Sequence, residues 1–370
     1  MDSKKFILLF RKKLYFKKKK IKNQKVKYLY YSIIIIVIII LFKFIIIRRY
    51  NNNVKEINNE QNNKENKELR EKMFKSLSRR ANKNITSLDD VYIGYHYKLG
   101  NSLIALNKVI YYCEILQCKR IFLNRNYYPL IKNIIYDKKY NLKIQLLTNS
   151  QKKDIKSLFL WPHPYYTTLI KLPENRFDVF KDEILNNLLK PSININDLYI
   201  HIRNGDVYKE PIRGRFYTQP PFCFYKKIIG LKKFTNIYIL AVNGDYPIIQ
   251  KLINEYTNIK YNNNPLIEDV SKLVYAYNII ASISSFSTSL IKLNDNLKNL
   301  WEYDFYHRIE KNYHLHHSIS NFTRKYTIYQ MKPSDIYMQK MRFWNRTDEQ
   351  LNLMVNDTCP NNFIVIKPNK

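Results

Sequence analysis

The sequence predicts an α/β protein made of two doubly wound halves. Short apolar strands alternate with amphipathic helices, and the alternation runs twice, over about residues 88–190 and 191–305. Apolar residues make up 45% of the 370-residue chain, which is enough for a sizeable core. Strands that alternate with helices in this way indicate parallel sheets. We therefore expect two such halves facing a cleft.

The first half is predicted from one strong strand, Val91–Tyr95, and the amphipathic helix Ser102–Leu116 that follows it. Two further strands are expected at Arg120–Leu123 and Lys143–Leu147. Both of these strands are short.

The second half is predicted from a longer series that begins with strand Leu198–Arg203. The later strands are expected at Ile237–Val242, Ile259–Tyr261, Ile279–Ser282 and Leu297–Tyr303. The helices are expected at Phe222–Leu231, Pro247–Tyr256, Ile267–Tyr277 and from Ser287 onward. Residues 306–370 form a C-terminal extension in which no pattern assigns an element.

The N-terminal 47 residues predict a membrane anchor. Residues 1–28 form a basic tail, and residues 29–47 are apolar except for Ser32 and Lys43. A helix of that length nearly covers the ~30 Å hydrocarbon core of a bilayer. The positive-inside rule places the tail in the cytosol, so we expect a single-pass type II signal-anchor with the rest of the chain in the secretory lumen. Residues 48–87 are polar and predict a stem, with a helix around Lys64–Ala81.

The formal charge of +33 is concentrated at that end of the chain. Residues 1–49 hold 15 Lys and Arg against one Asp. No zinc-finger or basic-zipper pattern accompanies the charge, so we expect a membrane partner and no nucleic-acid partner. The sequence leaves the oligomeric state open.

A lumenal location predicts two covalent features. Glycosylation sequons start at four asparagines, Asn84, Asn321, Asn345 and Asn356. Disulfides are allowed among the four cysteines, with three connectivities open. Cys113 and Cys118 lie roughly 140° apart around the predicted helix, so we expect them not to pair with each other.

The string LYIHIRNGDVY, from Leu198 to Tyr208, carries the strongest chemical pattern. Strand alternation places His201 and Arg203 on one face, and Arg203 lies at the carboxyl end, where open α/β sheets bind ligands. A guanidinium there can fork onto two phosphate oxygens. Gly205 allows backbone to approach the anion, and Asp206 can brace the arginine. The alternative is an Arg–Asp pair that only pins a turn.

His201–Asp206 resembles the H-x-R-x-G-D signature of the fucosyltransferase superfamily that forms alpha-1,2, alpha-1,6 and protein O-linked fucose. Two further stretches are similar to that family in the same order. Lys98-Leu99-Gly100-Asn101 resembles its G-x-G-N turn, although the first glycine is absent. Glu268-Asp269, followed by a strand and then Ser284–Thr288, resembles its acidic residue, strand and S-T-F-S turn.

The resemblance implies two Rossmann-like halves in a GT-B-like arrangement and a metal-independent, inverting transfer of fucose from GDP-fucose to a glycan hydroxyl, alpha-1,2 linkage being the first expectation. It implies a type II enzyme of the Golgi or endoplasmic reticulum. The donor-binding residues that it implies are His201, Arg203, Gly205, Asp269, Ser285, Phe286, Ser287, Thr288, Gly100 and Asn101. Independently of the family, anions bind at helix N-termini such as the one expected near Ser287.

Inversion by direct displacement needs a base to accept the proton of the attacking hydroxyl. Our candidate is Glu210, with Asp206 as second choice; the alternative for Glu210 is a surface residue. The lumenal part contains no D-x-D string for a divalent metal, so we expect no metal cofactor.

Three other functions remain open. The chain could be a related transferase that uses another nucleotide sugar, because the motif recognises phosphate and base better than fucose. It could be an inactive, membrane-anchored glycan-binding or scaffold protein. It could also be a basic membrane-proximal protein whose function is electrostatic.

Overall fold

The structure is a computed structural model, and it describes residues 48, 64, 66–75, 78, 86–93, 98–147, 158–159, 176–205, 219–304, 325–341, 343–360 and 363–368. The chain divides into two compact units, Met1–Leu69 and Arg70–Lys370. All described residues from Lys64 to Ser78 are helical, in the part of the stem where a helix is predicted. No helix among the described residues is long and apolar enough to cross a membrane, and the predicted anchor at 29–47 lies outside them.

The larger unit contains two sheets, each with helices around it, so the α/β class is confirmed. The first sheet has the order β3-β4-β2-β1-β5. Its strands are β1 (Asp90–Ile93), β2 (Arg120–Asn124), β3 (Ile135–Asp137), β4 (Leu142–Leu147) and β5 (Leu158–Phe159). All pairings are parallel except that between β3 and β4. Its helices are α3 (Leu99–Leu116) and α4 (Asp178–Asn186), with a short 3-10 turn, η1 (Arg125–Tyr127).

The second sheet has the order β12-β11-β10-β9-β6-β7-β8. Its strands are β6 (Leu198–His201), β7 (Ile237–Leu240), β8 (Ile259–Tyr261), β9 (Asn278–Ala281), β10 (Asn299–Tyr303), β11 (Thr327–Met331) and β12 (Ile364–Ile366). Only β12 is antiparallel to its neighbour. From β6 the chain builds outward through β7 and β8, then returns to β9 on the other side of β6 and builds in the opposite direction. The strand order therefore reverses between β6 and β9.

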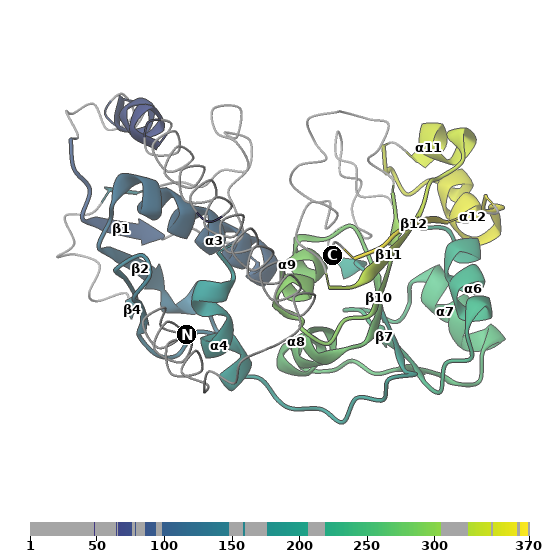
Figure 1. Cartoon of the computed structure of the whole chain (residues 1–370). Coiled ribbons are helices and arrows are strands. Elements are labelled where there is room, and N and C mark those ends of the chain that lie inside the picture. The colour runs from purple at the N-terminus through teal and green to yellow at the C-terminus, as the bar shows by residue number, and fades with distance from the viewer. Residues whose placement is uncertain are drawn as a thin grey trace, which may run out of the picture. The chain divides into compact units, whose positions relative to one another are not determined.

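Six helices accompany this sheet in the described part of the chain. They are α6 (Phe222–Leu231), α7 (Pro247–Glu255), α8 (Leu266–Tyr275), α9 (Ser285–Leu293), α11 (Asp335–Met341) and α12 (Asp348–Asn356). Figure 1 shows α6 and α7 on one side of the sheet and α8 and α9 on the other. Proline at the first position of α7 and the Thr347–Gln350 capping box of α12 account for two of the helix starts.

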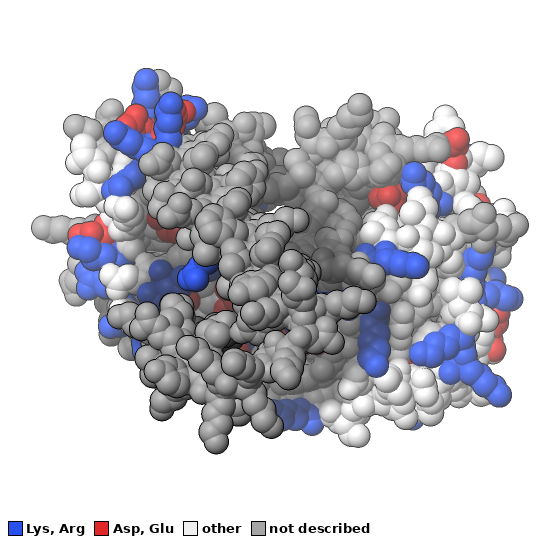
Figure 2. Space-filling view, in the orientation of Figure 1, with Lys and Arg blue, Asp and Glu red and all other residues white. Residues whose placement is uncertain are grey.

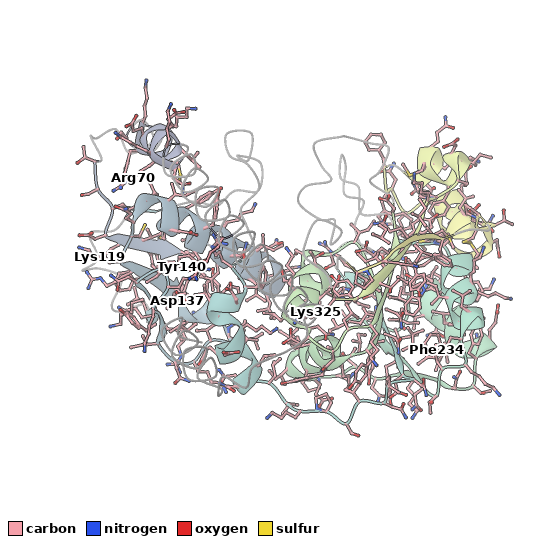
Figure 3. All side chains as sticks on the ribbon, viewed as in Figure 1. Arg70, Lys119, Asp137, Tyr140, Phe234 and Lys325 are labelled. Carbon is pink, nitrogen blue, oxygen red and sulfur yellow. A yellow bond between two sulfur atoms is a disulfide. The ribbon has the colours of Figure 1, made fainter. Side chains whose placement is uncertain are left out.

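The main core of the second sheet lies on the α6 and α7 side. Ile200, Ile239 and Ile280 of the central strands are fully buried there with residues of both helices, and side chains fill the space between sheet and helices in Figure 3. The C-terminal extension contributes Tyr337 and Trp344 to the same core, and β11 and β12 to the same sheet. The second half thus continues structurally beyond residue 305.

Two cysteines form a disulfide and two are free thiols. Cys223 of α6 is bonded to Cys359, which follows α12. Cys113 and Cys118 are both free and buried, so the prediction that they do not pair is confirmed. Helix α3 ends in a left-handed residue, Gln117, after which the Cys118 N–H donates to the carbonyl of Cys113. This helix end is a Schellman motif, which brings the two buried residues together.

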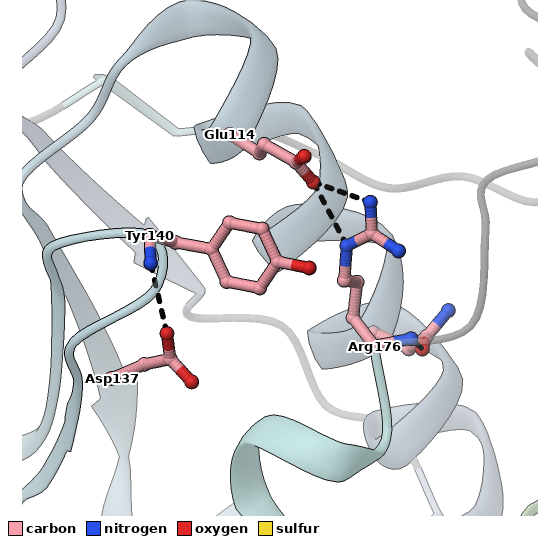
Figure 4. A network of polar contacts seen from close by, with 5 residues as sticks. Glu114, Asp137, Tyr140 and Arg176 are labelled. Atoms are coloured by element: carbon pink, nitrogen blue, oxygen red, sulfur yellow. Dashed lines mark hydrogen bonds and ion pairs between the residues drawn. The ribbon is translucent and has the colours of Figure 1, made fainter. Parts of the chain in front are cut away.

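A partly buried ion pair ties α3 to the segment before α4. Arg176, only 7% exposed, donates from Nε and Nη2 to Glu114 Oε2 at 2.8 and 2.6 Å. Its backbone N–H donates to Asn107 Oδ1, also on α3. The ring of Tyr140 lies 5.1 Å from the guanidinium, and the Tyr140 N–H donates to Asp137 (Figure 4). Arg176 therefore joins two helices and a strand-connecting turn of the first half.

We predict that Glu114→Gln lowers the free energy of unfolding by about 2 kcal/mol, because it removes the carboxylate charge that faces the largely buried guanidinium of Arg176. The matched control is Glu349→Gln, which removes an exposed pair with Lys340 of the same 2.6 Å length and should cost less than about 0.5 kcal/mol. Denaturant unfolding of both variants measures the difference. Equal effects would contradict the structural role of the buried pair.

Candidate functional site

Two of the predicted site segments lie at the carboxyl ends of neighbouring central strands. His201 is the last residue of β6, and Arg203 and Gly205 follow it. Ser285–Thr288 open α9 directly after β9, the neighbour of β6. The strand order reverses between these two strands, which is where open α/β sheets bind ligands. The predicted position of the site at the carboxyl edge of the sheet is therefore consistent with the observed topology.

His201 joins the two central strands. Its Nδ1 lies 2.7 Å from Ser282 Oγ, and its ring packs 5.2 Å from that of Phe286. The side chain is buried, and burial, followed by the positive charge of Arg203, lowers the pKa of His201 to about 3. The imidazole therefore stays neutral at physiological pH. Ile200 and Ile202 are buried in the core on the opposite face, so the predicted alternation is confirmed.

The backbone around Arg203 is fixed by two amide side chains that the sequence did not single out. Asn204 Oδ1 accepts from the N–H groups of Gly205 and Val242 at 3.0 and 3.2 Å, and its Nδ2 donates to Asn243 O. Gln219 Nε2 donates to the carbonyl of Arg203 at 2.6 Å. An amide side chain directly after a strand, such as that of Asn204, can be noticed in the sequence. Its bonding partners, Val242 and Asn243, lie on a segment distant in sequence and could not be identified from it.

The side-chain hydroxyl groups of the turn before α9 form hydrogen bonds with the backbone of the same turn. Ser284 is the N-cap and accepts from the Phe286 N–H. Ser287 donates to the carbonyls of Ser282 and Ser284, and Thr288 donates to that of Ser284. Ser287 and Thr288 are buried, whereas Ser285 and Phe286 are half-exposed. In this arrangement the hydroxyl groups of Ser284, Ser287 and Thr288 bond to the backbone of the turn and shape it.

Helix α3 brings a second N-terminus to the same place. Gly100 packs against the backbone of α9, and Ser289 Oγ donates to the Gly100 carbonyl at 2.9 Å. Further along the same two helices, Lys108 of α3 acts on Lys292 of α9. Burial, and then the positive charge of Lys108, lowers the pKa of Lys292 to about 7. The helices therefore run side by side from adjacent starts (Figure 1). Neither has an acidic residue in its first turn, so two positive dipole ends meet without a carboxylate of their own.

Asp269 lies apart from this cluster, in the first turn of α8 beyond β8. Strand β8, which precedes α8, is two strands from β6, so the ends of these two strands lie on the order of 10 Å apart. Burial raises the pKa of Asp269 to about 6, although Asn264 donates to Oδ1 at 3.0 Å. The charge of Asp269 also contributes to the raised pKa of Tyr261, the last residue of β8. Strand β7 lies between β6 and β8. Val242, just after the end of β7, is 74% exposed.

Other predicted residues lie in the periphery or outside the described residues. Asn101 is exposed in the first turn of α3. Asn345 and Asn356 are exposed, as acceptors of glycans must be. The candidate bases Asp206 and Glu210, and the sequons at Asn84 and Asn321, lie outside the described residues. Within the part of the chain that the structure describes, no group of three His, Cys, Asp or Glu could hold a metal ion.

Comparisons with models of protein families, with curated proteins and with solved structures find no match for this chain.

The contact between α3 and α9 makes a prediction about Gly100. A Cβ there would lie 2.5 Å from Phe286 Cα and from the carbonyl carbon of Ser285, and backbone atoms cannot move aside. Gly100→Ala should therefore lower the free energy of unfolding by about 3 kcal/mol. The control is Gly230→Ala in α6, where a Cβ meets nothing within 4 Å and a gain of up to about 1 kcal/mol is expected. Denaturant unfolding distinguishes them; two variants of equal stability would contradict the close approach.

Proposed function

We propose that this protein is a glycosyltransferase that transfers fucose from GDP-fucose to a glycan hydroxyl with inversion and without a metal. One observation carries the proposal: two helix N-termini and Arg203 gather at the reversal of strand order in the second sheet. A parallel sheet with its order reversing at the site is the architecture of Rossmann-like nucleotide-binding domains. The first sheet, in which β1 separates β2 from β5, supports a second Rossmann-like half and a GT-B-like pair.

The diphosphate of the donor would bind where these positive groups gather. The N–H groups in the first turns of α3 and α9 and the guanidinium of Arg203 supply hydrogen-bond donors for its oxygens. The first N–H groups of an α-helix have no acceptor within the helix, so those at the starts of α3 and α9 support an anion site. Burial keeps His201 neutral, so its side chain adds no charge to the site.

The guanine would bind toward Asp269. An ionised carboxylate accepts from two adjacent N–H groups of guanine, whereas uracil offers only one. The carboxyl ends of β6 and β8 are two strand spacings apart, on the order of 10 Å, which suits a nucleoside between its base and its diphosphate. The exposed Val242 between them offers an apolar surface to the nucleoside.

In the proposed reaction the acceptor oxygen attacks the anomeric carbon from the face opposite the leaving group. The bond from that carbon to the phosphate oxygen breaks, and its electron pair leaves with GDP. Arg203 and the two helix ends stabilise the charge that develops on the diphosphate. Glu210, or Asp206 as second choice, accepts the proton of the acceptor hydroxyl.

The same proposal includes a type II orientation in the Golgi or endoplasmic reticulum, with residues 29–47 as the anchor. The apolar segment and the basic tail support it. Two features of the larger unit agree with an oxidising, glycosylating compartment: the Cys223–Cys359 disulfide and the exposed sequon residues Asn345 and Asn356.

The electrostatic alternative rests on the basic tail, residues 1–28, which lies outside the described residues. On the face shown in Figure 2, the Lys and Arg side chains lie in separate groups, several with Asp or Glu beside them. A polyanion or a membrane surface is bound best by one continuous basic patch.

We expect the full chain, purified in detergent with EDTA, to bind GDP and GDP-fucose and to bind UDP and UDP-galactose at least tenfold more weakly. Arg203→Lys keeps the charge but loses the bidentate fork, so the affinity for GDP should fall by roughly ten- to a hundredfold. Isothermal titration calorimetry measures both, with thermal unfolding as the control for folding. Preferential UDP binding would assign another nucleotide sugar, and no binding by the folded chain would favour the scaffold function.

The raised pKa of Asp269 predicts a pH dependence of base recognition. Below about pH 6 the carboxyl becomes neutral and accepts poorly, so GDP affinity should fall roughly tenfold per unit as the pH decreases. The Asp269→Asn variant should bind GDP more weakly at neutral pH and should lack this loss of affinity at lower pH. The ratio of the two dissociation constants between about pH 5 and pH 8 cancels the ionisation of the phosphate, which both share. A ratio that stays constant across this range would remove Asp269 from the site.

A further inference from the structure

A relay of two hydrogen bonds connects the C-terminal part of the chain to Arg203. The hydroxyl of Tyr337, on α11, donates to the backbone carbonyl of Gln219 at 2.8 Å. The side-chain amide of Gln219 in turn donates to the backbone carbonyl of Arg203 at 2.6 Å. Tyr337 is fully buried and Gln219 is 6% exposed, so water competes weakly for either bond.

The bond from Gln219 acts where the sheet stops supporting the backbone. The last bond from β6 to β7 runs from the Ile202 N–H to the Leu240 carbonyl. One residue later the chain leaves the ladder, and Gln219 and Asn204 hold it on either side of the Arg203 peptide. The position and direction of the arginine side chain follow from the orientation of that peptide.

The chemistry of the relay allows only one arrangement. The Gln219 amide cannot rotate by half a turn, because its oxygen would then face the Arg203 carbonyl oxygen. Burial raises the pKa of the Tyr337 hydroxyl well above its usual value, with neighbouring tyrosines adding to the effect. The hydroxyl therefore stays protonated and remains a donor at any physiological pH. The ring of Tyr337 is itself held edge-on to that of Tyr303 of β10 at 5.9 Å.

We propose that Gln219 and Tyr337 are positioning residues that aim the guanidinium of Arg203 at the donor diphosphate. This inference rests on the proposed function and extends it to the C-terminal part of the chain, which supplies Tyr337. Both residues act through Arg203 and neither needs to touch the ligand.

The test removes one hydroxyl and measures the effect with and without Arg203. Tyr337→Phe keeps the ring and loses the bond to Gln219. The matched control is Tyr225→Phe, which removes an equally buried hydroxyl from the same core, one with no hydrogen-bond partner among described residues. Both are made in the full chain and in an Arg203→Ala background, and GDP is titrated calorimetrically in EDTA. Thermal unfolding of each variant is recorded.

We expect Tyr337→Phe to weaken GDP binding roughly three- to tenfold and Tyr225→Phe to leave it unchanged. In the Arg203→Ala background, Tyr337→Phe should add nothing, because its effect passes through the arginine. If Tyr337→Phe is too unstable to titrate, Gln219→Met replaces it with the same expectation.

Three results would overturn the inference, and they are distinguishable. Normal GDP binding by Tyr337→Phe, or an equal loss with and without Arg203, overturns the positioning role and leaves the proposed function standing. An unmodified chain that is folded but binds no GDP removes the proposed function and this inference together.

Discussion

The arrangement of the larger unit depends on the contact between Gly100 of α3 and the backbone of Phe286 in α9. This contact joins the helix that follows the first strand of one sheet to the helix that follows β9 of the other. Because position 100 has no Cβ, the two helices approach at their first turns. Two positive dipole ends are thereby adjacent, which is unfavourable in the absence of an anion and becomes favourable when one binds. The same interface buries Lys108 and half-buries Lys292, and burial lowers the pKa of Lys108 to about 8. The interface as a whole favours a bound negative charge.

Much of the fold could be predicted because its strands are buried on both faces. Helix α6 and strand β8 occupy the predicted residues, and the other strands of the second series differ by one or two residues at their ends. The differences have a physical reason. Val242 is apolar but lies beyond the last ladder bond of β7 and is exposed, so an apolar pattern alone extends that strand too far. Strands β11 and β12 and helices α11 and α12 were not predicted. Their sequences alternate weakly or are polar, because they lie toward one edge of the sheet.

The candidate site could be predicted in position and only partly in detail. The ends of β6 and β9 lie side by side because parallel strands present the same edge, so His201 and Ser282–Thr288 meet as the pattern implies. What each side chain does there depends on contacts across 16 to 39 residues of sequence, such as Gln219 with Arg203 and Asn204 with Asn243. The hydroxyls of Ser287 and Thr288 illustrate the limit. Their residue types suit a phosphate, but in the folded turn they bond to backbone carbonyls.

The disulfide has a consequence for the order in which the chain must mature. Cys223 is synthesised 136 residues before its partner Cys359, and during that interval Cys113 and Cys118 are the remaining candidates for exchange in an oxidising compartment. Both become buried when α3 packs, and burial raises the pKa of the Cys113 thiol well above its usual value. Exchange requires an accessible thiolate. In the oxidising compartment proposed above, packing of α3 before Cys359 is synthesised would remove the two wrong partners and protect the chain from mispaired, covalently trapped forms.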